Sequence, residues 1–126
     1  MKEYISLEKL EVYKLARQLS KITWEIYEKL DWRIKKIMGD QYVESTDSVG
    51  ANIAEGYGRF HYLDKIKFYY NARGSLLESR HWFDLLEERR FLEPEKEEKL
   101  KYLEYYRQLR PGLNALINSV LKVKNP

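Results

Sequence analysis

Cysteine is missing from this chain of 126 residues, and proline and glycine together number only nine. Without thiols the chain cannot form a disulfide framework, a thiolate zinc site, an iron–sulfur cluster or a cysteine nucleophile. The few prolines and glycines lie at separate points, which argues against a flexible linker. The N-terminus has no apolar run after its positive charge, so we expect no signal peptide, and no run of about 18 apolar residues could cross a membrane. We expect one ordered cytoplasmic domain over residues 1–126, with no membrane contact.

Residues that commonly build catalytic sites are also scarce. His61 and His81 are the only histidines, and neither lies at a metal-binding spacing from carboxylates. Gly56 and Gly58 form part of a dinucleotide fingerprint, but no strand precedes them, so helix termination explains them better. We therefore predict a protein that is not an enzyme and that has no cofactor and no metal site.

What the sequence has in abundance is Glu, Lys, Leu, Arg and Tyr at helical intervals. Apolar residues recur every three or four positions over residues 7–30, 34–57 and 64–91, and again after Pro94. Ser6 is positioned to cap the first of these helices. Four helices with short connections predict an all-α, antiparallel, up-down-up-down four-helix bundle.

Glycine and proline mark where these helices should end. Gly56 and Gly58 should stop the second helix as a C-terminal glycine cap. Pro111 and Gly112 interrupt the last helix, which predicts a kink or a break near residues 107–110.

The third helix carries apolar pairs at positions 69/70, 76/77, 82/83 and 85/86. Neighbouring residues on a helix point about 100° apart, so these pairs widen the apolar stripe beyond one bundle seam. Eleven tyrosines and three tryptophans are more than one small bundle usually buries. We expect part of this stripe to face another molecule, and so we expect a homo-oligomer.

Two signatures point to a family. The segment SVGANIAEGYGR at 48–59, followed by Phe68 and by ARGSLLE at 72–78, resembles the 23S rRNA intervening-sequence protein family. LEVYKLA at 10–16 and Gln41 extend the resemblance over about residues 7–92. The stretch from Asp31 to Ile37 departs from it, because family members often carry Pro and Glu there.

The resemblance implies a four-helix bundle whose molecular role is largely uncharacterised. It also implies kinship with the accessory variability proteins of diversity-generating retroelements, which are pentameric rings that bind nucleic acid and a reverse transcriptase. A pentamer, and RNA, DNA or a nucleic-acid-processing protein as partner, are thus expectations from resemblance.

The family motif can also be interpreted physically. A turn near residues 61–62 sets Gly74 opposite Val49 and Gly50, so that two glycines let the helix backbones cross closely. Arg73 then reaches toward Glu55. We interpret these residues as a polar clasp that fixes helix register, with a ligand or nucleic-acid site as the alternative. The motif comprises Asn52, Glu55, Gly56, Arg73, Gly74, Ser75 and Glu78.

Basic residues around the second turn suggest a nucleic-acid contact. With 23 basic against 20 acidic residues, the net charge of +3 does not establish one by itself. A charged rim is the plainer interpretation, whereas phosphate binding beside His61 and Tyr62 is the functional one. The candidate contacts are Lys35, Lys36, Arg59, Lys65 and Lys67.

The leading hypothesis is therefore a homo-oligomeric scaffold that binds nucleic acid or a protein that processes it. The rival hypothesis is a purely structural protein-interaction module without nucleic-acid binding.

Overall fold

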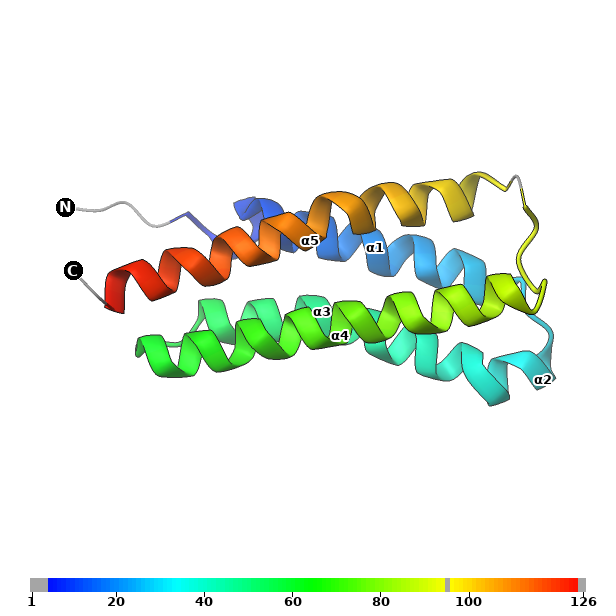
Figure 1. The fold of residues 1–126 in the computed structure, drawn as a ribbon, viewed down its shortest axis with the longest axis horizontal. Coiled ribbons are helices and arrows are strands. Elements are labelled where there is room, and N and C mark those ends of the chain that lie inside the picture. The colour runs from blue at the N-terminus through cyan, green and yellow to red at the C-terminus, as the bar shows by residue number, and fades with distance from the viewer. Residues whose placement is uncertain (1–4, 95, 125–126) are drawn as a thin grey trace.

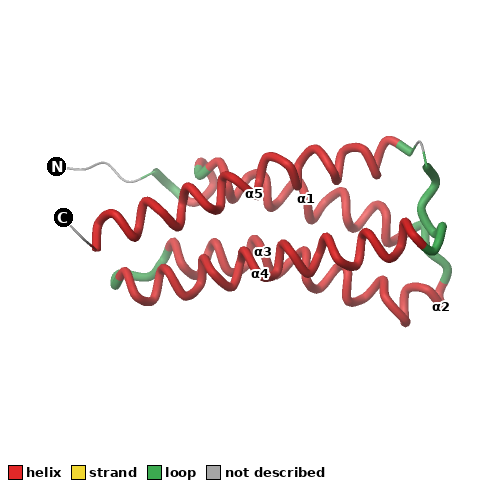
Figure 2. Tube along the Cα trace, viewed as in Figure 1, coloured by secondary structure: helices red, strands yellow, loops and turns green. Residues whose placement is uncertain are grey.

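The computed structural model describes residues 5–94 and 96–124, and within them the chain forms four long helices. These are α1 (Glu11–Glu28), α3 (Asp40–Tyr57), α4 (Tyr62–Glu88) and α5 (Glu97–Lys124). A 3₁₀ turn, Leu7–Lys9, precedes α1, and the short α2 (Trp32–Ile34) precedes α3. The described part of the chain contains no strand, so the predicted all-α fold is confirmed (Figure 2).

The helices form a closed ring in which α1 contacts α3 and α5, and α4 contacts the same two helices. Side-chain contacts help to place neighbouring helices. Lys29 just after the end of α1 pairs with Glu98 at the start of α5, so these two helices are antiparallel, while Ser48 and Ser75 join the middles of α3 and α4. Figure 1 shows the chain reversing direction from each long helix to the next, which gives an antiparallel bundle. None of its described helices is both long and apolar enough to span a bilayer.

The first helix buries a wider stripe than the sequence predicts. Ala16, Leu19 and Ile26 are buried as expected, but Val12 and Ile22 are also buried. Since α1 packs against both α3 and α5, its two flanks need apolar residues. Leu10 interrupts the predicted helix 7–30 by separating the 3₁₀ turn from α1.

The chain enters α3 through an irregular helix in the segment where the sequence departs from the family. The Asp31 carboxylate accepts a hydrogen bond from the Ile34 N–H at 3.0 Å and so caps α2. Residues Lys35–Gly39 are π-helical. A Cβ on Gly39 would lie 3.1 Å from the Tyr27 ring, so the absence of a side chain at Gly39 lets α1 pack closely against this turn.

The predicted glycine cap at the end of α3 is wrong in its geometry. Gly58 does end the helix, but with φ −80° instead of a left-handed conformation, and Gly56 lies inside α3. The left-handed residue is Arg90 at the end of α4, with φ 62°. Phe91 N–H donates to the Leu86 carbonyl at 2.9 Å and Arg90 N–H to that of Glu87 at 3.0 Å, which is a Schellman motif.

The predicted break in the last helix is also wrong. The α5 helix continues through Pro111 without interruption. Proline removes one backbone donor, but Pro111 is exposed, so water can reach this part of the helix. Gly112 has a packing role, because a Cβ there would lie 2.9 Å from Val12 Cγ1 of α1.

Two sets of hydrogen-bonded buried hydroxyls lie in the core, and together they join all four long helices. The Ser79 hydroxyl of α4 bonds Thr46 of α3 at 2.6 Å and Tyr102 of α5 at 2.7 Å. Thr23 of α1 donates to the Tyr42 hydroxyl of α3 at 3.3 Å. No buried side-chain nitrogen or oxygen in the described residues lacks a partner. Because an unpaired buried hydroxyl is costly, this network fixes how the helices are aligned.

We expect Ser79→Ala to lower the free energy of unfolding by about 1.5 kcal/mol, because it leaves the Tyr102 hydroxyl without its partner. The Thr46 hydroxyl also loses its bond to Ser79, but it still donates a hydrogen bond to the Tyr42 carbonyl at 2.8 Å, so this loss costs less. Urea unfolding followed by circular dichroism measures the effect. Ser75→Ala is the control, because Ser75 is only partly buried, and it should change stability by less than about 0.5 kcal/mol. Equal losses in both variants would contradict the assigned importance of the buried network.

Candidate interaction surfaces

The polar residues of the family motif meet where α3 packs on α4, but with different partners from those predicted. The Ser75 hydroxyl donates to Ser48 Oγ at 3.0 Å across the two helices. The Asn52 amide also reaches Ser48 Oγ at 3.0 Å, and it donates to the Ser48 carbonyl at 2.9 Å. A small polar contact therefore joins α3 and α4, built on Ser48 instead of on an ion pair.

The predicted Glu55–Arg73 pair is wrong. Glu55 lies on the surface and accepts a hydrogen bond from Arg59 at 3.1 Å, one turn further along the chain. Arg73 turns toward α5, where it donates to Asn114 Oδ1 at 3.2 Å and lies over the Tyr70 ring. Arg73 is thus on the α5 side of α4, because α3 occupies the other flank.

The predicted crossing of two glycines is wrong for the same reason. Gly50 faces α1, where an added Cβ would lie 3.6 Å from Ala16 Cβ. Gly74 is exposed, and an added Cβ would meet nothing within 4 Å. The close approach of α3 and α4 occurs at Gly56, where an added Cβ would lie 2.6 Å from the Tyr69 ring. Glu78 accepts a hydrogen bond from the Trp82 indole on the exterior of α4.

The five basic residues predicted to contact nucleic acid do not form one site. Lys35 and Lys36 precede α3, whereas Arg59, Lys65 and Lys67 follow it. The 18 residues of α3 separate the two groups by about 27 Å along the bundle. Figure 1 shows the two groups at opposite ends of the molecule. The prediction of a single basic cluster is therefore wrong.

Two of the five cations are engaged within the fold. Lys65 donates to the carbonyls of Gly56 and Tyr57 at 3.1 and 3.0 Å and so caps the end of α3. Partial burial lowers the pKa of Lys65 from its usual value. Arg59 pairs with Glu55 and lies over the Phe68 ring.

An exposed apolar stripe runs along the outside of α4. It follows helical spacing and consists of Leu63, Tyr70, Gly74, Leu77 and His81, with the exposed Lys67 lying between Leu63 and Tyr70, and we refer to it as the α4 stripe. Leu63, Tyr70 and Leu77 expose 62%, 42% and 49% of their surfaces. In the pairs 69/70 and 76/77 the first residue is buried and the second is exposed, which is the widened stripe that the sequence predicts.

A second surface was not anticipated from the sequence. Residues 65–77 of α4 and 105–123 of α5 contain six Lys and Arg residues and no Asp or Glu, and we call them the acid-free face. The two segments lie side by side, since Arg73 bonds Asn114 and Tyr69 packs with Ile117 and Val120. The signal was present in the sequence as two segments without carboxylates. Only the fold shows that they are neighbours.

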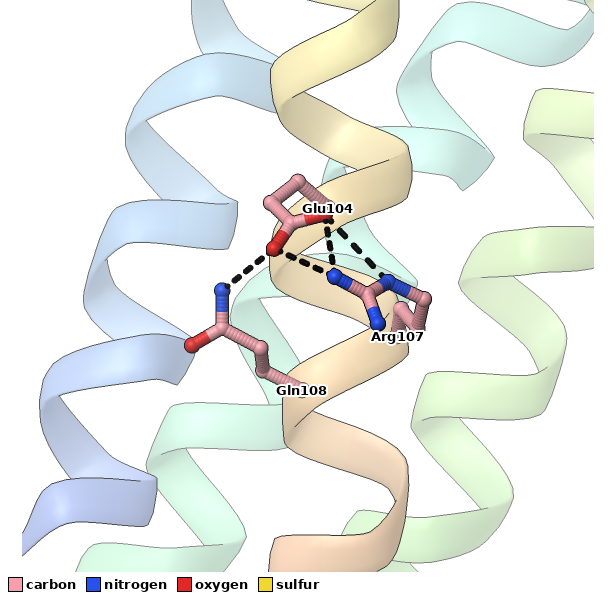
Figure 3. Close-up of polar contacts among 3 residues, drawn as sticks. All are labelled: Glu104, Arg107 and Gln108. Carbon is pink, nitrogen blue, oxygen red and sulfur yellow. Dashed lines mark hydrogen bonds and ion pairs between the residues drawn. The ribbon is translucent and has the colours of Figure 1, made fainter.

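An ion pair marks the edge of the acid-free face. Glu104 accepts two hydrogen bonds from the Arg107 Nη2 group, at 2.7 and 2.8 Å, and one from Gln108 at 3.0 Å (Figure 3). Arg107 lowers the pKa of Glu104, which therefore stays ionised. The charge of Arg107 is thus largely neutralised, whereas Arg110 is exposed one turn further along.

Among the described residues, no group of three or more His, Asp and Glu side chains is arranged to hold a metal ion. A pocket between α1 and the α4–α5 connection is lined by Ile26, Leu30, Leu92 and the Lys29–Glu98 pair. Lys29 lowers the pKa of Glu98, which favours the ionised carboxylate in this ion pair. Proton transfer generally needs a group with a pKa nearer neutrality.

The chain matches a known protein family over most of its length. The sequence model of the 23S rRNA-intervening sequence protein family matches residues 8–114. The chain belongs to this family. The match extends beyond the segment identified from its motifs, through the first two thirds of α5.

A solved relative supports the same fold for this intervening-sequence protein. It is a protein of unknown function from the S23 ribosomal protein family of Bacteroides thetaiotaomicron, with a TM-score of 0.73 and 19% identity. The alignment covers 85% of this chain and 95% of the relative. No curated protein matches the chain.

Proposed function

We propose that this intervening-sequence protein is a non-enzymatic scaffold that assembles with further copies of itself and binds nucleic acid or a protein that processes it. The observation that carries the assembly is the α4 stripe. Three large apolar side chains exposed along one helix face, Leu63, Tyr70 and Leu77, support a protein interface.

Gly74 gives a second reason to place another helix on this stripe. A glycine inside a helix costs about 1 kcal/mol relative to alanine. Apart from its chain neighbours and the backbone of its own helix, no atom of the described chain lies within 4 Å of its missing Cβ, so packing within the chain does not require it. A partner helix that crosses here would use the space, because glycine lets helix axes approach closely.

The charges along α4 favour a second copy as the occupant. Residues 65–77 carry only basic charges, whereas the remainder of the helix carries Asp64, Glu78, Asp84, Glu87 and Glu88 together with the basic Arg80. An antiparallel contact between two α4 helices places the predominantly acidic end of each beside the end of the other that carries Lys65. That contact gives a dimer, whereas a head-to-tail ring gives the pentamer expected from the family resemblance.

Light scattering on the purified chain tests the assembly. We expect a mass that is a multiple of 15.3 kDa, and its value distinguishes the dimer from the pentamer. Leu77→Glu should weaken association at least about tenfold, because it places a charge in the stripe. Leu100→Glu is the matched control, since Leu100 of α5 is similarly exposed, at 58% against 49%, but lies outside the stripe.

A monomer at all micromolar concentrations would contradict the assembly, and so would equal effects of the two glutamates. A purely structural protein-interaction module stays the alternative if self-association occurs without nucleic-acid binding. The proposal also includes the absence of enzymatic activity and a cytoplasmic location.

A further inference from the structure

We propose that the acid-free face is where this protein binds the phosphodiester backbone of nucleic acid, without reading its sequence. This inference rests on the nucleic-acid part of the proposed function and assigns it to residues outside the predicted cluster, apart from Lys65 and Lys67. It concerns the exterior of α5 and the adjoining flank of α4.

The charge of the protein is unevenly distributed. The whole chain carries +3, whereas the acid-free face carries +6, so that the remaining residues carry −3. A net charge near zero therefore conceals one strongly basic surface. Cations gathered on one face are the electrostatic footprint of phosphate binding.

Several cations on this face have no carboxylate partner in the described chain. Arg73 is held by the neutral Asn114 amide and by the Tyr70 ring, so it is positioned while it keeps its charge. Arg110, Lys122 and Lys67 are exposed, and none forms an ion pair with a described residue. By contrast, Arg107 is paired with Glu104 and Lys65 caps α3.

The polar residues between these cations favour a phosphate backbone over a membrane surface. Asn114, Asn118 and Ser119 are exposed on the same part of α5, and no large apolar side chain is exposed between Arg110 and Lys122, whereas Tyr70, Leu77 and Val123 are exposed elsewhere on the face. Arg, Lys, Asn and Ser are the side chains that commonly contact phosphate and sugar. Binding of a lipid surface by these α5 cations would require exposed apolar residues among them to enter the bilayer.

The face is long enough for several phosphates. Arg110 and Lys122 are 12 residues apart in α5, which is about 18 Å along the helix. One strand of a duplex places a phosphate about every 3.4 Å, so about five phosphates span this distance. With Lys67 and Arg73 on the neighbouring helix, about four cations can contact the backbone.

Fluorescence anisotropy tests the assignment with the full chain and labelled strands of about 20 nucleotides, as single-stranded RNA, single-stranded DNA and duplex DNA, at about 50 to 200 mM salt. Four contacts predict a slope of log K against log salt near −3 on single strands, at about −0.7 for each phosphate. The duplex slope should be steeper, at about −0.9 for each phosphate.

The deciding variant is Arg110→Gln with Lys122→Gln, because neither side chain forms an ion pair with a residue that the structure describes. It should reduce the single-strand slope by about 1.4 and weaken binding at least about tenfold at about 50 mM salt. The matched control is Arg33→Gln with Lys36→Gln, which removes the same charge from exposed residues at the other end of the bundle. The control should bind nearly as tightly as the wild type.

The outcomes separate the assigned site from the proposed function. If the wild type binds and both variants lose affinity equally, the site is wrong while nucleic-acid binding stands. If the wild type does not bind at about 50 mM salt, both fail. If polyglutamate of similar length competes as well as the single strand does, the face binds acidic polypeptides and the assignment to nucleic acid is overturned.

Discussion

Raising the pH from about 9 to 11.5 is expected to lower the free energy of unfolding by roughly 6 kcal/mol, a large part of the stability of a small domain. The cause is three buried tyrosines, Tyr42, Tyr69 and Tyr102, each 1% exposed or less. Burial raises the pKa of Tyr69 to about 12 and raises those of Tyr42 and Tyr102 from the usual 10.0.

The sign follows from which state holds the protons. Below about pH 10 the phenols are neutral in both states, so their contribution to stability is fully present. Above that pH the unfolded chain releases its phenolic protons while the folded chain keeps them. Stability then falls by about 1.4 kcal/mol per pH unit for each tyrosine, until the folded pKa is reached.

Urea midpoints at a series of alkaline pH values measure this loss, with tyrosinate absorbance as a second signal. Tyr102→Phe should make the slope of stability against pH shallower by about 1.4 kcal/mol per unit. Ser79→Ala is the control, because it destabilises the core at every pH without removing a titrating group. A slope that is unchanged in Tyr102→Phe would contradict the assigned role of the buried phenols.

The architecture was largely predictable because helical periodicity and chain reversals are local signals. The turn near residues 61–62 even predicts the correct level of α4 against α3. Gly74 was expected opposite Val49 and Gly50, and Ser75 indeed lies beside Ser48. The rotation of each helix about its axis was not predictable in this way, since it depends on which helices lie on each flank.

The errors at the predicted site follow from that rotation. Arg73 and Gly74 lie at the right level, but one turns toward α5 and the other toward the exterior. The acid-free face was missed for a related reason, because its two segments are separated by almost 30 residues of sequence. A cluster of charges on one helix can be recognised from the sequence. A cluster formed by two neighbouring helices can be recognised only once their packing is known.

Among the substitutions of glycine by alanine, Gly56→Ala should be the most damaging. We expect it to lower the free energy of unfolding by about 3 kcal/mol. An added Cβ would lie 2.6 and 2.8 Å from two atoms of the Tyr69 ring and 3.1 Å from Phe68 Cβ. Real Cβ atoms do not approach this closely, and the buried Tyr69 ring is packed with Ile117 and Val120 of α5. The strain therefore spreads from the α3–α4 contact to α5.

Two other glycines provide matched controls for this substitution. Gly58→Ala should change stability by less than about 0.5 kcal/mol, because its Cβ would make ordinary contacts at 3.6 and 3.7 Å and its φ is −80°. Gly74→Ala should stabilise the isolated chain by about 1 kcal/mol, since it improves helix propensity in open space. Urea unfolding of the three variants gives three different expected outcomes for the same added methyl group. If Gly56→Ala were as stable as Gly58→Ala, the close packing of α3 on α4 through Gly56, and with it the register of the bundle described here, would be wrong.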